Sequence, residues 1–320
     1  MAEQRKARFS FTSPAQLDVL RFTGIEGISR LYQFELDLVS ASPGIALGSM
    51  IRKPVTLSIV GREADRHVHG IVARFEVLGA RRNHTLYRAH LVPPQHCLTL
   101  RRRLRIFQRM TTEQIVSQVL REAGITRQRW RLRGRYTPRD YCVQFRESDH
   151  DFVSRLLEEE GIAYHFDHAA DSVTTVFTDR SSAFEDIEGG SRLDYAEGSG
   201  QDADAEAITH LRVGQQLRSG KVTLRDHDFK RPGADLEARR SGEETSLEHY
   251  DFPGEYVSAG LGRRLARARL QELETDREPA TAASPSNRLV PGRTFTIGGW
   301  FTGRHARGSA NQGYLVVAAA

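Results

Sequence analysis

The stretch Tyr141-Cys-Val-Gln-Phe-Arg-Glu-Ser-Asp-His-Asp-Phe-Val-Ser-Arg-Leu-Leu-Glu-Glu-Glu-Gly-Ile-Ala-Tyr-His-Phe166 decides the fold of this chain. Its first residues show the period-two apolar alternation of a β-strand. Ser148 follows in the position of a helix N-cap, with Asp151 three residues on as a variant of the capping box. Apolar residues at helical spacing come next, and Gly161 ends the helix where a left-handed residue is favoured. The stretch therefore predicts a strand, a helix and a second strand.

This stretch contains no side chain that looks like a nucleophile or a metal ligand, so it indicates architecture rather than chemistry. Three glutamates, Glu158 to Glu160, stand at the end of its helix. The C-terminal end of a helix dipole is negative, so each acid there costs up to about 1 kcal/mol. We therefore expect nearby arginines to pair with these glutamates.

The composition is that of a globular protein, with 320 residues, 39% hydrophobic and 27% charged. A chain of this length suggests two or three domains. No apolar run reaches the roughly 18 residues of a membrane helix, and the N-terminal residues do not resemble a secretory signal. Cys97 and Cys142 are the only cysteines, which favours a reducing cytoplasm over a disulfide framework. The net charge of +5 comes mostly from arginine and is too small to indicate nucleic-acid binding.

The first hundred residues have the pattern of an all-β domain. The strand-like segments are 32–39, 55–59, 67–78 and 85–92. Turn-rich sequence separates the last two, and Pro93-Pro94 ends the block. Several short strands at this spacing predict a first β-barrel over residues 1–100.

Residues 101–185 predict a mixed α/β insertion with two amphipathic helices. One helix begins at the capping box Thr111–Gln114 and stops at Gly124. Residues 129–135 place four arginines on one face of a possible strand, and the stretch that opened this section supplies the second helix. Residues 180–205 are polar and rich in Gly, Ser and Asp, which predicts a long loop or linker.

The last part, residues 186–320, predicts a second β-barrel with a helical insertion near 256–276. Its expected strands are 208–213, 222–226, 294–298 and 314–317. An arginine-rich amphipathic helix is expected at 261–273 and a loop at 281–287. Residues 56–61 resemble residues 294–299, with a proline shortly before each, although short β patterns also recur by chance.

Several groups of histidines and carboxylates have spacings that could form a site. His67 and His69 have the spacing of two metal ligands on one strand face, but no third ligand is evident nearby. The other combinations are His165 with Asp167 and His168, Asp226 with His227 and Asp228, and Glu147 with Asp149 and Asp151. The second of these combinations reads as a solvated turn, and the third as acids at a helix N-terminus. We predict no catalytic, cofactor-binding or metal-binding residues.

The glycine-containing motifs of enzymes are incomplete. Gly198–Gly200 lacks the pattern of a nucleophile elbow, and Gly260–Gly262 lacks the third glycine of a dinucleotide fingerprint. A hydrolase would also need an activated nucleophile, which the sequence does not show. We therefore predict that the protein is not an enzyme and needs no cofactor.

Two arginine clusters, at 101–105 and 127–135, leave a nucleic-acid-binding module as an alternative. Single-stranded nucleic acid favours a basic groove with stacking aromatics, and Trp130 and Tyr136 stand near the second cluster. Against this alternative, aromatic residues are few, and Trp130 is expected to point into the core, opposite the arginines.

Several motifs, in this order, carry a resemblance to a known family: Gly24–Leu38, Arg105–Ile115, Tyr141–Phe166, Tyr250–Tyr256, and Leu289–Phe295 with Tyr314–Val316. Over roughly residues 9 to 317 the chain resembles the N-terminal hub region of VgrG, the spike protein of type VI secretion. This region is related to the late-control D hub proteins of contractile phage tails.

The resemblance implies a β-rich α+β fold with two similar β-barrels and α/β insertions. Three such chains would assemble into a homotrimer whose six barrels stack on a hexameric tube protein, Hcp in type VI systems. The implied function is that of a structural hub between a sixfold tube and a trimeric puncturing needle. It would assemble in the cytoplasm and be exported by sheath contraction without a signal peptide. A phage or prophage tail baseplate hub is the main alternative.

One departure from the family pattern concerns the C-terminal region. Family members usually continue into an oligonucleotide-binding (OB)-like domain and a triple-stranded β-helix spike, some with a toxin beyond. The sequence stops at Ala320, so we expect the OB domain and the β-helix spike to be absent from this chain. Association between hubs would then depend on hub-to-hub contacts alone.

Overall fold

The computed structural model describes residues 9–42, 44–81, 83–196, 206–298 and 313–320. The chain divides into two compact units. The first consists of Met1–Leu156, Ile162–Ala207 and Pro285–Ala320, and the second of Leu157–Gly161 and Ile208–Ser284. Each unit has its own hydrophobic core.

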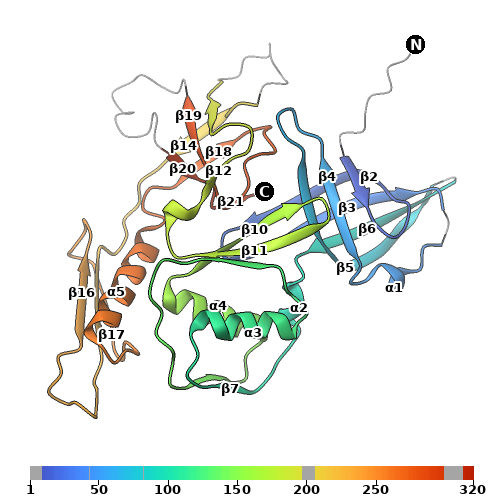
Figure 1. Ribbon diagram of the computed structural model, residues 1–320. Coiled ribbons are helices and arrows are strands. Elements are labelled where there is room, and N and C mark those ends of the chain that lie inside the picture. The colour runs from blue at the N-terminus through green and yellow to red at the C-terminus, as the bar shows by residue number, and fades with distance from the viewer. Residues whose placement is uncertain (1–8, 43, 82, 197–205, 299–312) are drawn as a thin grey trace. The chain divides into compact units, whose positions relative to one another are not determined.

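A seven-stranded antiparallel sheet forms the first part of the first unit, in the order β1-β4-β5-β6-β3-β2-β21 (Figure 1). Its strands are β1 Phe9–Thr12, β2 Asp18–Gly27, β3 Arg30–Ser40, β4 Pro54–Ile59, β5 Arg66–Arg81, β6 His84–Val92 and β21 Ala318–Ala319. The predicted alternation in β3 is confirmed, because Phe34, Leu36 and Leu38 are all buried. Two short helices, α1 Leu47–Met50 and α2 His96–Thr99, follow β3 and β6.

This sheet curls without closing through hydrogen bonds. The Phe9 ring on β1 meets the Phe22 ring on β2 edge to face, with 5.3 Å between their centroids. Among the described residues, however, no ladder joins these two strands, and β2 pairs on its outer side only through Glu26 and Gly27. Where the sequence predicted a first barrel, the structure therefore has a curved, nearly closed sheet.

The middle segment contains the predicted strand, helix and strand. Its elements are β7 Arg105–Phe107, α3 Thr112–Glu122, β8 Gln128–Arg131, β9 Cys142–Gln144, α4 Asp149–Glu160, β10 Ala163–Ala169 and β11 Ser172–Thr178. The capping box of Thr111 and Gln114 is confirmed, and Ser148 Oγ accepts a hydrogen bond from the amide of Asp151 at 3.0 Å. Gly161 has the expected positive φ of 67°.

Two sheets arise from this segment. β10, β11 and β8 form a three-stranded sheet, in which β8 runs parallel to β11. β7 and β9 form an antiparallel ribbon, with Ile106 opposite Val143. Trp130 stacks on Phe177 at 4.0 Å, which agrees with its expected direction toward the core.

The polar stretch after β11 is a loop only in part, so the predicted loop was wrong for residues 181–183, 185–186 and 192–194. A short 3₁₀ turn, η1 Ser181–Ala183, precedes β12 Glu185–Asp186 and β13 Arg192–Asp194. Both strands pair in parallel with β19 Arg293–Gly298, whose other partner is β20 Gly313–Leu315. A single buried residue anchors each strand, Ile187 beside β12 and Leu193 in β13. Because isolated apolar residues show no period-two alternation, the sequence pattern did not predict these strands. Residues 197–205 lie outside the described residues.

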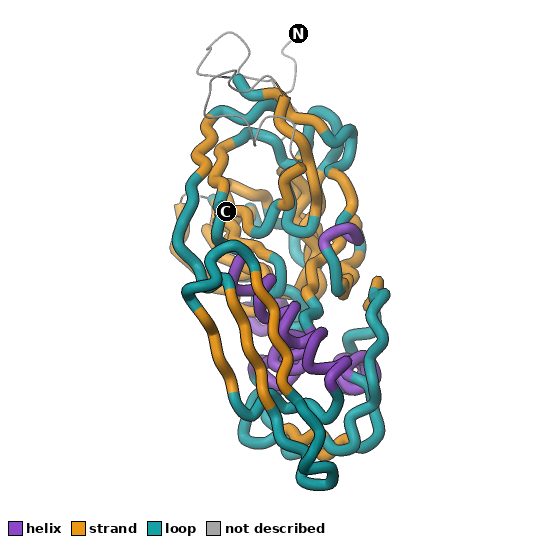
Figure 2. The backbone as a smooth tube through the Cα atoms, turned by 90° about the vertical axis from the view of Figure 1, so that its left-hand side faces the viewer, coloured by secondary structure: helices purple, strands orange, loops and turns teal. Residues whose placement is uncertain are grey.

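The second unit packs one helix on a small sheet. Its elements are β14 His210–Val213, β15 Lys221–Arg225, β16 Glu237–Ser241, β17 Glu248–Asp251, α5 Ala259–Glu274 and β18 Ala280–Ala283. Figure 2 shows the strands β16, β15 and β17 side by side, with a helix behind them. α5 confirms the predicted helix, whereas the loop expected at 281–287 was wrong in part, because β18 pairs with β14.

The core of this unit centres on Tyr256. The ring is buried, and its hydroxyl donates to the carbonyls of Leu224 and Leu236 on the sheet side. The expected partner of the helix-end glutamates is confirmed at Glu160, because the Arg264 side chain of α5 donates to its carboxylate. Across the described residues, no helix combines the length and apolar character needed to cross a bilayer.

Candidate functional site

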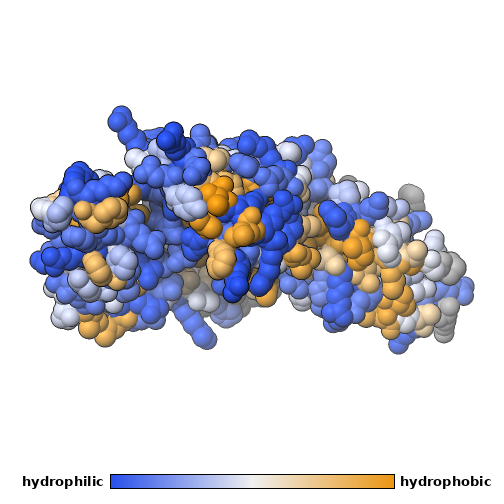
Figure 3. Space-filling model, turned by 90° about the horizontal axis from the view of Figure 1, so that it is seen from below, coloured by the Kyte–Doolittle hydropathy of each residue, from blue (hydrophilic) through white to orange (hydrophobic). Residues whose placement is uncertain are grey.

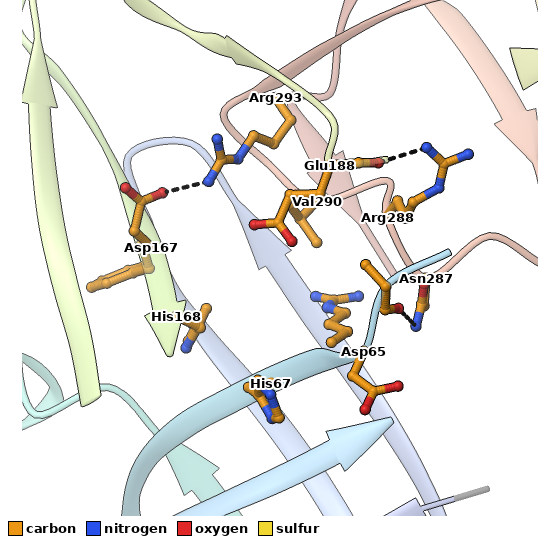
Figure 4. Close-up of a pocket in the computed structure, with 12 residues that line it drawn as sticks. Asp65, His67, Asp167, His168, Glu188, Asn287, Arg288, Val290 and Arg293 are labelled. Carbon is orange, nitrogen blue, oxygen red and sulfur yellow. Dashed lines mark hydrogen bonds and ion pairs between the residues drawn. The ribbon is translucent and has the colours of Figure 1, made fainter. Parts of the chain in front are cut away.

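A polar cavity of about 370 Å³ lies in the first unit, where three segments distant in sequence meet (Figure 4). The start of β5 supplies Asp65, Arg66 and His67, and β10 supplies Phe166, Asp167 and His168. The third side is formed by Asn287, Arg288, Val290 and Arg293, together with Glu188. His67, Asp167 and His168 were candidate residues in the sequence, but their separation along the chain gave no sign that they line one cavity.

The charges around this cavity compensate one another. Arg293 pairs with Asp167 at 3.2 Å and with Glu185 at 2.8 Å. Arg288 is buried, bonds to Glu206 at 2.5 Å and donates to the carbonyl of Glu188. Since these guanidinium groups already have carboxylate or carbonyl partners, the arrangement holds chain segments together more readily than it activates a reactant.

The carboxylates at this junction stay ionised because of their partners. Burial alone would raise the pKa of Glu206, but hydrogen bonds from Arg288 and Ser286 outweigh burial and hold that pKa below its usual range. Burial would likewise raise the pKa of Asp167, but the hydrogen bond that its carboxylate accepts from His165 and the charge of Arg293 outweigh burial and lower that pKa. Both groups are thus structural anions, and neither resembles the raised-pKa carboxyl of a general acid.

His168 is neutral in the folded protein. Burial lowers its pKa to about 3, with a further contribution from the charge of Arg66. Its Nδ1 accepts a hydrogen bond from the backbone amide of His69 at 3.1 Å, so the proton of the neutral ring lies on Nε2. That Nε2–H has no hydrogen-bond partner among the described residues, and the same holds for Nε of Arg66.

The other histidine and carboxylate candidates have structural partners. Nδ1 of His67 lies 2.9 Å from Ser58 Oγ, and Nδ1 of His69 lies 2.8 Å from Thr56 Oγ1, each across the β4–β5 pair. In the second unit, Asp228 pairs with Arg231 at 2.9 Å. Within the described ranges, no group of three or more His, Cys, Asp or Glu residues is arranged to hold a metal ion.

Asp149 has a role that the sequence analysis did not predict. Its side chain is fully buried at the start of α4, and a helix N-terminus alone was offered as the reason for an acid there. The carboxylate contacts Arg105 at 2.6 Å, Arg101 at 3.1 Å and the amide of Gln144 at 2.9 Å. This cluster joins β7, β9 and α4 through one buried charge. The arginine cluster at 101–105 was the only signal in the sequence.

Arginines of both sequence clusters are also engaged in ion pairs. Arg105 pairs with Glu122 as well as Asp149, Arg129 lies 3.4 Å from Asp167, and Arg131 lies 2.6 Å from Glu185. These intramolecular pairs reduce the charge that would be available to a phosphate backbone. The geometry therefore gives little support to the nucleic-acid alternative.

Comparison with known proteins places these features in a family. Residues 25–320 match the phage tail baseplate hub (GPD) family. The chain belongs to this family. It is 37% identical over 94% of its length to the type VI secretion system spike protein VgrG4b of Pseudomonas aeruginosa. The resemblance to the hub region of VgrG proteins is therefore confirmed. The chain spans only 37% of the length of that relative.

Solved structures support the same fold. The Escherichia coli c3393 protein, described as a type VI secretion component with similarity to the T4 tail proteins gp27 and gp5, aligns with a TM-score of 0.73. That alignment covers 98% of this chain and 72% of the other, at 22% identity. The 43 kDa tail protein of prophage MuSo2 from Shewanella oneidensis aligns with a TM-score of 0.64 over 97% of this chain and 92% of its own, at 13% identity. The expected tail-hub-like, β-rich fold is thus confirmed.

The buried carboxylate of Asp149 should be essential for stability. Asp149→Asn removes the buried negative charge and leaves the half-buried Arg101 and Arg105 without it, so we expect a loss of about 3–5 kcal/mol in the free energy of unfolding. Urea denaturation followed by circular dichroism measures this loss. Asp151→Asn is the matched control, because its side chain is 66% exposed and its loss should stay below about 1 kcal/mol. Equal losses in the two variants would contradict the role of the cluster.

The neutral state of His168 should make stability depend on pH. The unfolded chain binds a proton at this side chain below about pH 6.5, whereas the folded chain does not until about pH 3. Stability therefore falls as the pH drops through this window, and His168→Gln should reduce that fall. Nitrogen-15 NMR of the ring should show an unchanged tautomer with the proton on Nε2 between pH 7.5 and 4.5. A midpoint near 6.5 for this ring would contradict its burial.

Proposed function

We propose that this chain is the structural hub of a type VI secretion spike, where it adapts a hexameric tube to a trimeric puncturing needle. The observation that carries the proposal is the family match over residues 25–320, together with a VgrG relative at 37% identity. The geometry supports a mechanical role, because the polar cavity described above is lined by charges that pair with one another. The proposed role is therefore non-enzymatic.

The proposed architecture has two barrels of similar design. The first corresponds to residues 1–100, whose sheet brings β1 and β2 close together. Residues 101–185 are the α/β insertion, and the second barrel spans 186–320 with a helical insertion near 256–276. Three such chains would present six barrels to a sixfold tube, which resolves the mismatch between sixfold and threefold symmetry.

The proposed partners follow from this symmetry. They are two further copies of the chain, a hexameric Hcp-like tube protein, and a spike or effector domain such as the longer relatives could contain beyond the matched region. Assembly in the cytoplasm and export by sheath contraction belong to the same proposal. A phage or prophage tail hub is the alternative, favoured by the TM-score of 0.64 with a prophage tail protein, and it differs in the tube partner.

The hub function predicts ring-shaped trimers that bind a tube protein. Light scattering after size exclusion should show a trimer at high protein concentration or with an Hcp hexamer present, and negative-stain imaging should show rings. A phage tail-tube protein tested in parallel separates the type VI role from the phage role, since only the matching tube should co-elute. Protein that stays monomeric at all concentrations and ignores both tube proteins would contradict the hub function.

A further inference from the structure

The ribbon of β7 and β9 presents an apolar face to solvent. Its ladder continues beyond the two strands, through a bridge between Arg102 and Ser148 at one end and between Met110 and Arg139 at the other. Alternate residues of the ribbon face the interior of the first unit. Phe107, Cys142 and Gln144 are buried, and the Phe107 ring stacks on Phe152 at 5.6 Å. The intervening residues therefore lie on the opposite face.

That opposite face is apolar over its whole length. Leu104 is 70% exposed, Ile106 58%, Tyr141 57% and Phe145 60%, and Val143 lies between them opposite Ile106. We call these five residues the ribbon face. Seen from below in Figure 3, hydrophobic side chains gather in the middle of the surface, beneath the place of β7 in Figure 1. Contiguous exposed apolar patches of this kind mark interaction sites in soluble proteins.

The ends of the ribbon face are positively charged. Arg102, Arg109 and Arg146 are exposed and have no ion-pair partner among the described residues. Arg102 and Arg146 stand at one end of the ribbon, beside Leu104 and Phe145, and Arg109 stands at the other end. The guanidinium of Arg146 lies 5.2 Å from the centroid of the Phe145 ring, so one charge borders directly on the apolar surface. Asp140 is the exposed acid nearest to Arg109 in the ladder.

We infer that the ribbon face is a docking surface for an acidic, apolar β segment of a different protein. Two rows of side chains at strand spacing fit the alternating side chains of an extended partner, and acidic groups flanking those side chains would meet the arginines. A second copy of this chain fits less well, because its own ribbon ends carry three exposed arginines, Arg102, Arg109 and Arg146, against one exposed acid, Asp140. The proposed hub function does not assign this surface, and the inference does not depend on trimer or tube formation.

A pair of synthetic peptides tests the charge and shape of the partner. The first is fluorescein-labelled Glu-Glu-Leu-Thr-Val-Thr-Phe-Glu-Glu, whose apolar side chains share one face and whose glutamates flank them at both ends, and the second carries lysine in place of each glutamate. Fluorescence anisotropy with the full chain should show binding of the acidic peptide at least tenfold tighter than of the basic one, and the preference should weaken at high salt. Equal affinity for the two peptides, or no binding of the acidic peptide, would overturn the inference.

Substitutions then locate the binding site. Ile106→Ser combined with Phe145→Ser should weaken binding of the acidic peptide at least tenfold, and Arg102→Glu combined with Arg146→Glu should remove the preference for acid. The matched control is Leu217→Ser with Phe229→Ser, which removes a leucine 73% exposed and a phenylalanine 79% exposed beside Lys230. Binding that is lost in the control as well, or kept in the ribbon variants, would refute the assignment.

Two checks keep the result interpretable. Thermal melting must show that the ribbon variants fold. If the serine variant does not fold, Ile106→Thr with Phe145→Thr replaces it, because threonine places a β-branched residue with high strand propensity at each position. Sedimentation velocity compares the wild-type chain with the ribbon variants. Self-association of the wild-type chain that disappears in the ribbon variants would identify a second copy as the occupant and overturn the inference.

Discussion

Burial of Tyr32 holds the first unit together. The side chain is 1% exposed, and its hydroxyl donates to the carbonyl of His69 on β5, so the ring is anchored within the seven-stranded sheet. Its faces and edges meet Phe166 at 5.0 Å and His168 at 4.9 Å on β10. One aromatic residue thus joins the N-terminal sheet to the middle segment. Because a buried phenol needs a hydrogen-bond partner, this contact also fixes the position of β5 relative to β3.

The polar cavity follows from that packing. Once β10 is fixed against β5, Asp167 and His168 border the start of β5, and Arg293 closes the third side by pairing with Asp167. The Asn287 side chain donates to the carbonyl of Ala64 at 3.2 Å, which attaches the returning chain to the same place. A buried set of ions and hydrogen bonds specifies one arrangement of three segments, since any other would leave charges unpaired. Such specification agrees with the proposed role of the chain as a structural hub.

Local signals in the sequence predicted the helices well. The capping box at Thr111, the N-cap at Ser148 and the left-handed Gly161 each act within a few residues, so their physical effects can be read directly from the sequence. The alternation in β3 likewise predicted its buried face. These signals depend on backbone geometry and on one face of one element, and no distant residue is needed to interpret them.

Signals that depend on distant partners were missed. β12 and β13 pair in parallel with β19, more than a hundred residues later, and their polar residues gave no alternation. Asp149 was interpreted through the helix dipole, although its buried ion pairs with Arg101 and Arg105 are far stronger determinants. The residues of the polar cavity come from three separate segments, so only the folded chain brings them together. Similarity to a family supplied the fold where local patterns did not.

The exposed surfaces of the first unit differ in how they control association. On the edge strand β2, a bulge at Leu20 interrupts the ladder with β3, and Arg21 is 73% exposed while it pairs with Asp37. Bulges and charges of this kind discourage unselective pairing at a strand edge. The ribbon of β7 and β9 is different, since its apolar side chains are exposed in two rows and arginines stand at its ends. Edge pairing through the backbone would accept almost any strand, whereas a side-chain face bordered by arginines selects for shape and charge. The first unit therefore restricts indiscriminate association at its sheet edge and concentrates selective recognition on side chains.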